Sequence, residues 1–245
     1  MIVLFTDFGA EDIYVAQVKA ALLERLATAT PVLDLLHTVP SFRIDAGAHL
    51  LAALQARFPQ GTVFFTVVDP GVGSARQAAV VQADGKWYVG PDNGLLSVTA
   101  ARAAQARTWR IVWRPTNLSG SFHGRDLFAP IAAWIAEGAL PDDAIEPTPA
   151  LHVQLSAADL AQVIYVDHYG NALTGLRAHN VSIRATISIG GRTLRYARVF
   201  AEAAAGDAFW YANSLGLVEI AAFGASAAER LGIGVGDAVD AIDAA

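Results

Sequence analysis

The sequence predicts an α/β protein with a second, smaller all-β domain. In the amino-terminal part, apolar runs typical of buried strands alternate with amphipathic helical patterns, which indicates βαβ units and a parallel sheet. After a proline- and acid-rich stretch at 140–148, which reads as a linker, the helical patterns mostly stop and short strands follow. We therefore expect an α/β/α domain with a mostly parallel sheet at 1–145 and a barrel-like all-β domain at 155–245.

The elements of the first domain follow from local sequence patterns. Short apolar, β-branched runs bounded by turn residues predict strands at 2–6, 32–36, 62–67, 78–82, 86–89 and 108–112. Helices are expected at 12–26, 44–58, after Gly94 and at 127–137. Asp12 is the predicted N-cap of the first helix, and Pro130 falls in the first turn of the last helix, where proline is tolerated.

The second domain is predicted from six short strand patterns. They lie at 162–167, 171–176, 182–189, 193–197, 209–211 and 217–221. Gly190-Gly191 separates two of them and is typical of a two-residue hairpin turn. The domain is expected to end near 234–242.

Composition argues against several classes of protein. Of 245 residues, 54% are hydrophobic and 16% are charged, which indicates a compact globular chain. A formal charge of −6 without a long basic run argues against a nucleic-acid partner, and no apolar run is long enough to span a membrane. The chain has no cysteine and begins with strand-like residues rather than a signal peptide, so we expect a cytoplasmic protein. Its low charge mildly favours an oligomer.

A turn at 68–76 carries the strongest candidate chemistry. Asp69 follows the predicted strand 62–67 and so lies at a carboxyl end, where open α/β sheets bind ligands. Pro70 biases Asp69 towards extended geometry, the glycines after it let a ligand approach the main chain, and Arg76 supplies a permanent cation. For an isolated Asp-Pro-Gly sequence, a hairpin turn with a surface ion pair would be the better explanation.

Other polar residues follow strands of the same predicted sheet. They are Asp7, Asp92, Asn93, His123, Arg125 and Asp126. Each alone could be a helix cap or part of a local salt bridge, but a rim of such residues is typical of α/β enzymes. A metal site, as in a metal-dependent phosphohydrolase, is disfavoured because Arg76 competes for the carboxylate. The sequence also lacks a P-loop and a Gly-x-Ser-x-Gly elbow.

Two turns of the second domain carry polar groups that a ligand could meet. They are Asp167-His168-Tyr169-Gly170-Asn171 and Asn213-Ser214-Leu215-Gly216. Each by itself is as consistent with an ordinary β-turn as with a ligand site. The neighbouring Trp210 and Tyr211 are more often core or interface residues than stacking platforms.

Six motifs occur in a fixed order along nearly the whole chain: Thr6-Asp7-Phe8-Gly9, Val68-Asp69-Pro70-Gly71-Val72-Gly73, Pro91-Asp92-Asn93-Gly94, Phe122-His123-Gly124-Arg125-Asp126 and the two turns just described. Together they resemble the S-adenosyl-L-methionine (SAM) hydroxide adenosyltransferases, relatives of the bacterial fluorinase and chlorinase. The resemblance implies an α/β amino-terminal domain, a barrel-like carboxy-terminal domain and a homotrimer with ligand sites between neighbouring subunits.

The resemblance also implies an activity, the hydrolysis of SAM to adenosine and L-methionine without a cofactor or metal. An activated water or hydroxide attacks ribose C5′ in line with the sulfonium, so catalysis is by positioning and desolvation. Asp69, Arg76 and His123 match the residues that hold this nucleophile in the hydrolytic members. The fluorinase resemblance would require tyrosine in place of Asp69 and His123, and a carboxylate repels halide ions, so hydroxide transfer is favoured over a halide-using reaction.

Substrate contacts implied by the resemblance fall on Asp7, Phe42, Phe122, Gly124, Asp167, Asn171 and Ser214. Asp7 would accept hydrogen bonds from the ribose hydroxyls beside a wall formed by Phe42. Asp167 would pair with the methionine ammonium and Ser214 with its carboxylate. Asn171 would read the adenine edge, together with backbone groups near 222–224.

Two departures from the family pattern bear on the adenine contacts. Thr174 is followed by Gly175 where the family often has Thr-Asn, and Ala222-Phe223 stands where the halogenases carry Arg-Asn. An alternative from another class is a non-catalytic sensor that binds SAM or adenosine and returns it intact.

Overall fold

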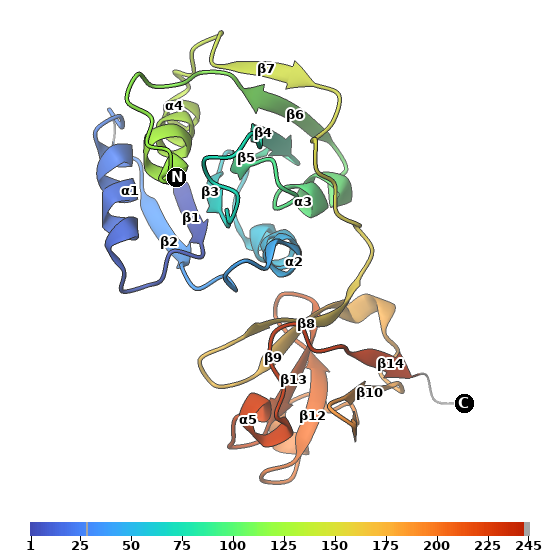
Figure 1. Ribbon diagram of the computed structural model, residues 1–245. Helices are drawn as coiled ribbons and strands as arrows, with labels where there is room; N and C mark the ends of the chain where they lie inside the picture. The colour runs from blue at the N-terminus through green and yellow to red at the C-terminus, as the bar shows by residue number, and fades with distance from the viewer. Residues whose placement is uncertain (28, 243–245) are drawn as a thin grey trace. The chain divides into compact units, whose positions relative to one another are not determined.

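The computed structural model describes residues 1–27 and 29–242 (Figure 1). It divides into two compact units, which consist of residues 1–51 with 57–157 (unit 1) and of residues 52–56 with 158–245 (unit 2). Each unit has its own sheets and its own apolar core. The last three residues of the predicted second domain lie outside the described residues.

Unit 1 is built on a seven-stranded sheet with the strand order β2-β1-β3-β5-β4-β6-β7. The strands are β1 (Ile2–Thr6), β2 (Val32–Leu36), β3 (Val63–Val67), β4 (Ala78–Ala83), β5 (Lys86–Pro91), β6 (Ala106–Ile111) and β7 (Ile145–Thr148). β1 pairs in parallel with β2 and β3, and β3 pairs in parallel with β5. The other neighbours are antiparallel. The predicted α/β class is confirmed.

The linker predicted at 140–148 is wrong in its second half. Ile145–Thr148 forms β7, the edge strand of the sheet, and pairs with β6 so that Pro147 lies opposite Trp109. Proline is tolerated there because an edge strand needs no ladder hydrogen bond on its outer side. The proline- and acid-rich composition therefore marks a strand at the edge of the sheet as well as a connection.

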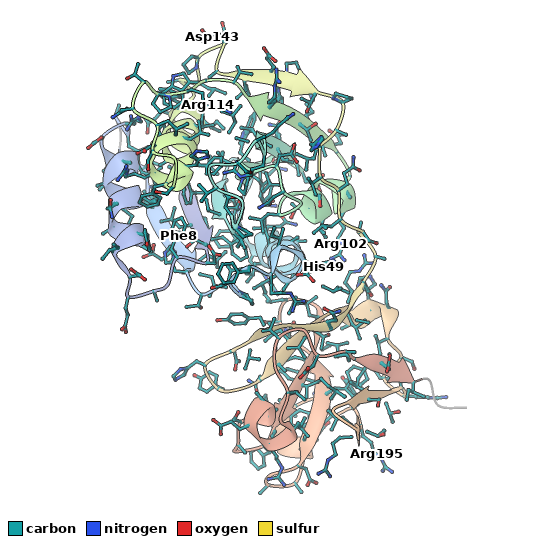
Figure 2. The ribbon with its side chains drawn as sticks, in the orientation of Figure 1. Phe8, His49, Arg102, Arg114, Asp143 and Arg195 are labelled. Atoms are coloured by element: carbon teal, nitrogen blue, oxygen red, sulfur yellow. The ribbon has the colours of Figure 1, made fainter. Side chains whose placement is uncertain are left out.

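Helices cover both faces of the sheet (Figure 1). They are α1 (Ile13–Leu23), α2 (Ile44–Leu54), α3 (Ser97–Arg102) and α4 (Ala129–Glu137), with the 3-10 helix η1 (Gln55–Arg57) and the π-helix η2 (Gly124–Phe128). Alternate strand residues such as Leu4 and Phe65 pack with α1 and α4 in one core. On the other face, Arg102 of α3 donates to the Ala157 carbonyl, and its Nη2 lies 3.2 Å from Nδ1 of His49 on α2 (Figure 2).

The predicted helix starts agree with the structure. Asp12 is the N-cap of α1, and its carboxylate accepts a hydrogen bond from the Ile13 N–H at 2.6 Å. Pro130 lies in the first turn of α4. The helix predicted at 44–58 ends earlier, at Leu54, and continues as η1.

Unit 2 contains two small sheets with the strand orders β11-β10-β14 and β12-β13-β9-β8, all antiparallel. Its strands are β8 (Leu160–Val166), β9 (Ala172–Arg177), β10 (Thr186–Ile189), β11 (Arg192–Leu194), β12 (Ala208–Ala212), β13 (Leu217–Ala222) and β14 (Asp240–Ile242). The predicted hairpin at Gly190-Gly191 is confirmed, since both glycines have positive φ and Ile189 pairs with Arg192. Positive φ is open to glycine because it has no Cβ.

Three short helices of unit 2 have no strong sequence pattern. They are η3 (Ala178–Asn180), η4 (Phe200–Glu202) and α5 (Ala227–Leu231). The hydroxyl of Ser226 caps α5 by accepting the Glu229 N–H at 3.1 Å. None of the helices in the described part of the chain has both the length and the apolar character needed to cross a membrane.

Candidate active site

The turn at 68–76 continues directly from the buried strand β3. Gly73 has φ +79°, and a Cβ built on it would lie 2.4 Å from the carbonyl oxygen of Gly120. Only glycine permits this approach, so the turn lies against the loop that leads to His123. Asn93 supports the end of the strand, because its side-chain amide donates to the Val68 carbonyl at 2.8 Å.

Asp69, Arg76 and His123 form one hydrogen-bonded cluster. The Arg76 guanidinium binds both carboxylate oxygens of Asp69, with Nε 2.7 Å from Oδ1 and Nη2 in a short contact with Oδ2. The same Nη2 lies 3.2 Å from Nδ1 of His123. The side chains of Asp69 and Arg76 are only 4% and 11% exposed, so water screens this pair little. The structure thus brings together the three residues that the sequence singled out.

This arrangement assigns the protons of His123. A guanidinium nitrogen can only donate, so Nδ1 of His123 accepts from Arg76 and the neutral ring carries its proton on Nε2. Burial lowers the pKa of His123, and the Arg76 cation lowers it further. His123 is therefore a neutral N–H donor at neutral pH. It stands just before η2, a π-turn of the kind that often marks functional sites.

Asp7 lies close enough to Asp69 for the two carboxylates to interact. Burial raises the pKa of Asp7, and the charge of Asp69 raises it further, while backbone N–H groups of Asp7 itself and Phe42 act in the opposite direction. Phe42 has the left-handed φ of +66°, which is rare for an aromatic residue, and its side chain is 75% exposed. The strained backbone presents an N–H to Asp7 and leaves the ring free for a ligand.

Phe122 and Gly124 belong to an aromatic group beside His123. The Phe122 ring packs edge-on against Phe8 and Tyr14, with centroids 5.8 and 5.4 Å away. A Cβ on Gly124 would lie 3.0 Å from the Phe8 ring, so a side chain there would press on this packing. The Arg125 guanidinium lies 5.1 Å from the Phe122 centroid, a cation–π distance.

Three further candidates at this sheet edge have structural roles. Asp92 is buried and accepts the N–H groups of His152 and Val153, at 2.9 and 3.2 Å. Arg125 and Asp126 form the predicted local salt bridge, with Nε 2.6 Å from Oδ1. These residues hold neighbouring chain segments rather than contributing to the Asp69 cluster.

The predicted ligand residues of unit 2 line a cavity of about 820 Å³. Asp167, Asn171 and Ser214 all contribute to its wall. Asp167 is also the centre of its own turn: its carboxylate accepts the N–H groups of Tyr169 and Asn171, at 2.9 and 2.8 Å. The Asn171 amide donates to the same carboxylate at 3.0 Å. Asp167 and Asn171 are thus held as one unit at the cavity wall.

Sequence reasoning missed Glu219 in the same cavity. Glu219 is 5% exposed, and its carboxylate accepts from the Tyr211 hydroxyl at 2.5 Å and the Asn213 amide at 2.8 Å. Burial raises the pKa of Glu219, and the charge of Asp167 adds to that effect. One acid inside the apolar strand Leu217–Ala222 is the signal that could have identified it, because a buried charge needs partners.

In the described part of the chain, no group of three or more His, Asp or Glu side chains is arranged to hold a metal ion. Both carboxylate oxygens of Asp69 accept from Arg76, a fixed cation that would repel a metal ion at the same carboxylate. The site therefore offers a fixed cation, a carboxylate and a neutral imidazole for binding a small nucleophile.

Fold and site together define a two-unit α/β and all-β protein with a guanidinium–carboxylate–imidazole site. The model of the SAM hydroxide adenosyltransferase N-terminal domain matches residues 2–145, and that of the C-terminal domain matches residues 161–240. The chain belongs to the SAM hydroxide adenosyltransferase family.

Relatives and a solved structure match over nearly the whole chain. A protein of Thermus thermophilus named (R)-S-adenosyl-L-methionine hydrolase is 37% identical, with 93% of this chain and 94% of that protein covered. A protein of the same name from Salinispora arenicola is also 37% identical, with 95% and 94% covered. Fluorinases match at 25–28% identity over 72–93% of this chain. An uncharacterized conserved protein from Thermotoga maritima has a TM-score of 0.87 at 29% identity, with 99% of this chain and 100% of that chain covered.

Proposed function

We propose that this protein hydrolyses SAM to adenosine and L-methionine, and that it accepts the (R)-epimer at sulfur named in its relatives. The observation that carries the proposal is the buried cluster of Asp69, Arg76 and His123. It offers hydrogen-bonding groups for a water molecule and places a carboxylate where a halide ion would be repelled.

The reaction needs little from the enzyme beyond position. The water oxygen forms a bond to C5′ as the C5′–sulfur bond breaks, and the bonding pair leaves on sulfur to give a neutral thioether. A proton is lost from the water, so the products are adenosine, methionine and one proton. Because the sulfonium is already a good leaving group, in-line orientation and exclusion of bulk water supply the main acceleration.

Each residue of the cluster has a distinct role in this proposal. Asp69 accepts a hydrogen bond from the water and directs its lone pair at C5′. His123 donates a hydrogen bond from its Nε2–H to the water oxygen, since its Nδ1 accepts from Arg76. Arg76 keeps Asp69 ionised and in place, and favours the hydroxide form as the proton leaves. No cofactor takes part.

The proposed substrate contacts fall on residues of both units. In unit 1, Asp7 accepts hydrogen bonds from the ribose hydroxyls, beside the exposed ring of Phe42 and the surface near Phe122 and Gly124. In unit 2, the ligand residues implied at its cavity are Asp167 for the ammonium, Ser214 for the carboxylate and Asn171 for adenine. Among the described residues, the cavity wall includes Asp167 and Glu219 but no lysine or arginine, which supports a cationic ligand.

Two finer proposals come from the family resemblance rather than from the described contacts. The protein assembles as a homotrimer with ligand sites between neighbouring subunits, and it works in the cytoplasm. Light scattering coupled to size exclusion tests the first, with a mass of about three chains expected and a monomeric mass contradicting it. Cell fractionation tests the second.

Product analysis tests the proposed activity. The protein is incubated with (R)-SAM and with (S)-SAM, in the presence and absence of excess chloride, and the products are separated by chromatography with mass detection. Hydrolysis predicts equal amounts of adenosine and methionine, faster from the (R)-epimer. Intact ligand would indicate a sensor, and 5′-chloro-5′-deoxyadenosine would indicate a halide-using enzyme. Activity that survives exhaustive chelation would remove the metal-dependent alternative.

A further inference from the structure

A chain of hydrogen bonds runs behind the turn that follows β1. Nζ of Lys19 lies 2.5 Å from Oδ2 of Asp34, and Oδ1 of Asp34 lies 3.0 Å from Nε2 of His37. Nδ1 of His37 lies 2.8 Å from the Thr6 hydroxyl, which also accepts the Phe8 N–H at 3.3 Å. None of these residues takes part in the proposed chemistry.

The protonation of these groups fixes which of them donates and which accepts in each hydrogen bond. Burial acts to raise the pKa of Asp34, but hydrogen bonds from His37 and Lys19 outweigh it and the pKa is lowered. An ionised Asp34 only accepts, so the neutral His37 ring carries its proton on Nε2 and Nδ1 is an acceptor. The Thr6 hydroxyl then donates to Nδ1, which leaves its oxygen lone pair to the Phe8 N–H.

These side-chain hydrogen bonds lie beside the end of β1, where its pairing with β2 becomes irregular. The register of β1 against β2 shifts between Leu4 and Phe5, whereas its pairing with β3 on the other side stays regular to Thr6 and Val67. Beyond the shift, the His37 carbonyl accepts the Gly9 N–H at 2.7 Å, and the Thr6 carbonyl accepts the Val39 N–H at 3.1 Å. Main-chain and side-chain bonds of the same segment thus hold both ends of the turn.

Because Thr6 and His37 are buried, loss of the hydrogen bond between their side chains would destabilise the turn. Thr6 is 1% exposed and His37 is 8% exposed. A buried polar group whose partner is removed has no water to replace it. The turn is therefore expected to shift or loosen when either the hydroxyl or the imidazole is deleted.

We propose that His37, acting through Thr6, is a positioning residue that sets the place of the Asp7 carboxylate. Asp7 stands between Thr6 and Phe8, the two residues that the chain ties together. The inference rests on the proposed function, in which Asp7 binds the ribose diol. It adds that affinity for the diol depends on groups that touch no ligand.

Four variants separate positioning from bulk. His37→Phe and Thr6→Val keep the volume and remove the hydrogen bonds, whereas His37→Gln and Thr6→Ser keep groups able to form them. Calorimetry measures binding of adenosine and of 2′,3′-dideoxyadenosine, which lacks the 2′- and 3′-hydroxyls of the diol and keeps the 5′-hydroxyl. The first two variants should weaken adenosine binding about tenfold, as for loss of one hydrogen bond, and leave the dideoxy compound unchanged within about twofold. The other two should bind both ligands within about threefold of the wild-type protein.

Steady-state kinetics give a second readout. Because the diol contact is made before and during the reaction, His37→Phe should raise KM for SAM and leave kcat within about threefold. Equal weakening of both nucleosides would show a merely structural role and overturn the proposal. So would unchanged adenosine binding by a folded His37→Phe protein, and if that variant does not fold, Thr6→Val decides.

Failure of the proposed function has a different signature. In that case the wild-type protein releases no adenosine from SAM or binds no adenosine. Amide hydrogen exchange at Phe8 and Gly9 then tests the positioning alone. Faster exchange in His37→Phe and Thr6→Val, but not in His37→Gln and Thr6→Ser, supports it, and equal exchange in all five proteins contradicts it.

Discussion

Replacing Arg76 by lysine tests the geometry of the cluster while keeping its charge. Arg76 makes four side-chain hydrogen bonds: two to Asp69, one to the Gln77 carbonyl and one to His123. A lysine ammonium is a single point donor and cannot bridge both carboxylate oxygens and the imidazole. We expect at least two of these bonds to be lost.

The size of the effect follows from those bonds. At about 1.5 kcal/mol for each bond to a charged group, the loss is about 3 kcal/mol, or on the order of 100-fold in kcat/KM. The affinity for adenosine should change by less than about threefold, because adenosine does not depend on the orientation of the nucleophile. Adenosine release by chromatography and adenosine binding by calorimetry measure the two quantities.

A matched arginine provides the control for this experiment. Arg110→Lys changes an exposed ion pair with Glu146 and should leave kcat/KM as in the wild-type protein. Thermal unfolding by circular dichroism confirms that both variants are folded. Near wild-type turnover by Arg76→Lys would refute the reasoning, because a bare positive charge would then be sufficient.

Three other results are expected. Because the pKa of His123 is lowered, the ring gains its proton below pH 6.5, so kcat/KM should be flat near neutrality and fall at more acidic pH; His123→Gln should lack this acidic limb in a pH–rate profile. Gly73→Ala places a Cβ 2.4 Å from a carbonyl oxygen at positive φ and should cost about 1–3 kcal/mol in urea unfolding, whereas Gly71→Ala meets only ordinary contacts and should cost less than about 1 kcal/mol; similar costs would contradict the close approach. Glu219→Gln should weaken methionine binding several-fold, as measured by calorimetry, and should not stop the release of adenosine from SAM. Unchanged methionine affinity would argue against binding of the methionine ammonium in this cavity.

The lowered pKa of His123 also makes the stability of the folded chain depend on pH. A histidine whose pKa is lower in the folded than in the unfolded protein leaves the unfolded chain with more bound protons below about pH 6.5. The His123 contribution to stability is therefore complete above that pH and declines as the pH falls through this window. Urea unfolding between pH 7.5 and 5.5 measures it, with His123→Gln as the comparison.

Local patterns in the sequence were sufficient for much of the fold. The apolar runs placed β1, β2 and β3, and the cap at Asp12 placed the start of α1. They failed at β7, where proline and acidic residues hide an edge strand, and at α5, which is only five residues long. Edge strands and single-turn helices depend on tertiary contacts more than on pattern.

The candidate site was predictable where residues follow strands. Asp69 and Asp7 lie after neighbouring parallel strands, and parallel strands end at one sheet edge, so their proximity could be inferred. The bond from Arg76 to Nδ1 of His123 could not be inferred, because it joins two loops whose close approach at Gly73 and Gly120 leaves no local pattern in the sequence. The placement of the proton on Nε2 of His123 follows from that bond.

The most direct test of the central claim is the fate of the oxygen atom. The wild-type protein is incubated with SAM in water enriched in ¹⁸O, and the masses of the products are measured by mass spectrometry. Hydrolysis at C5′ predicts one ¹⁸O in adenosine and none in methionine, with no detectable turnover by Asp69→Ala or Arg76→Ala despite retained adenosine binding. Unlabelled adenosine, a halogenated nucleoside, or near wild-type turnover by either variant would contradict the account.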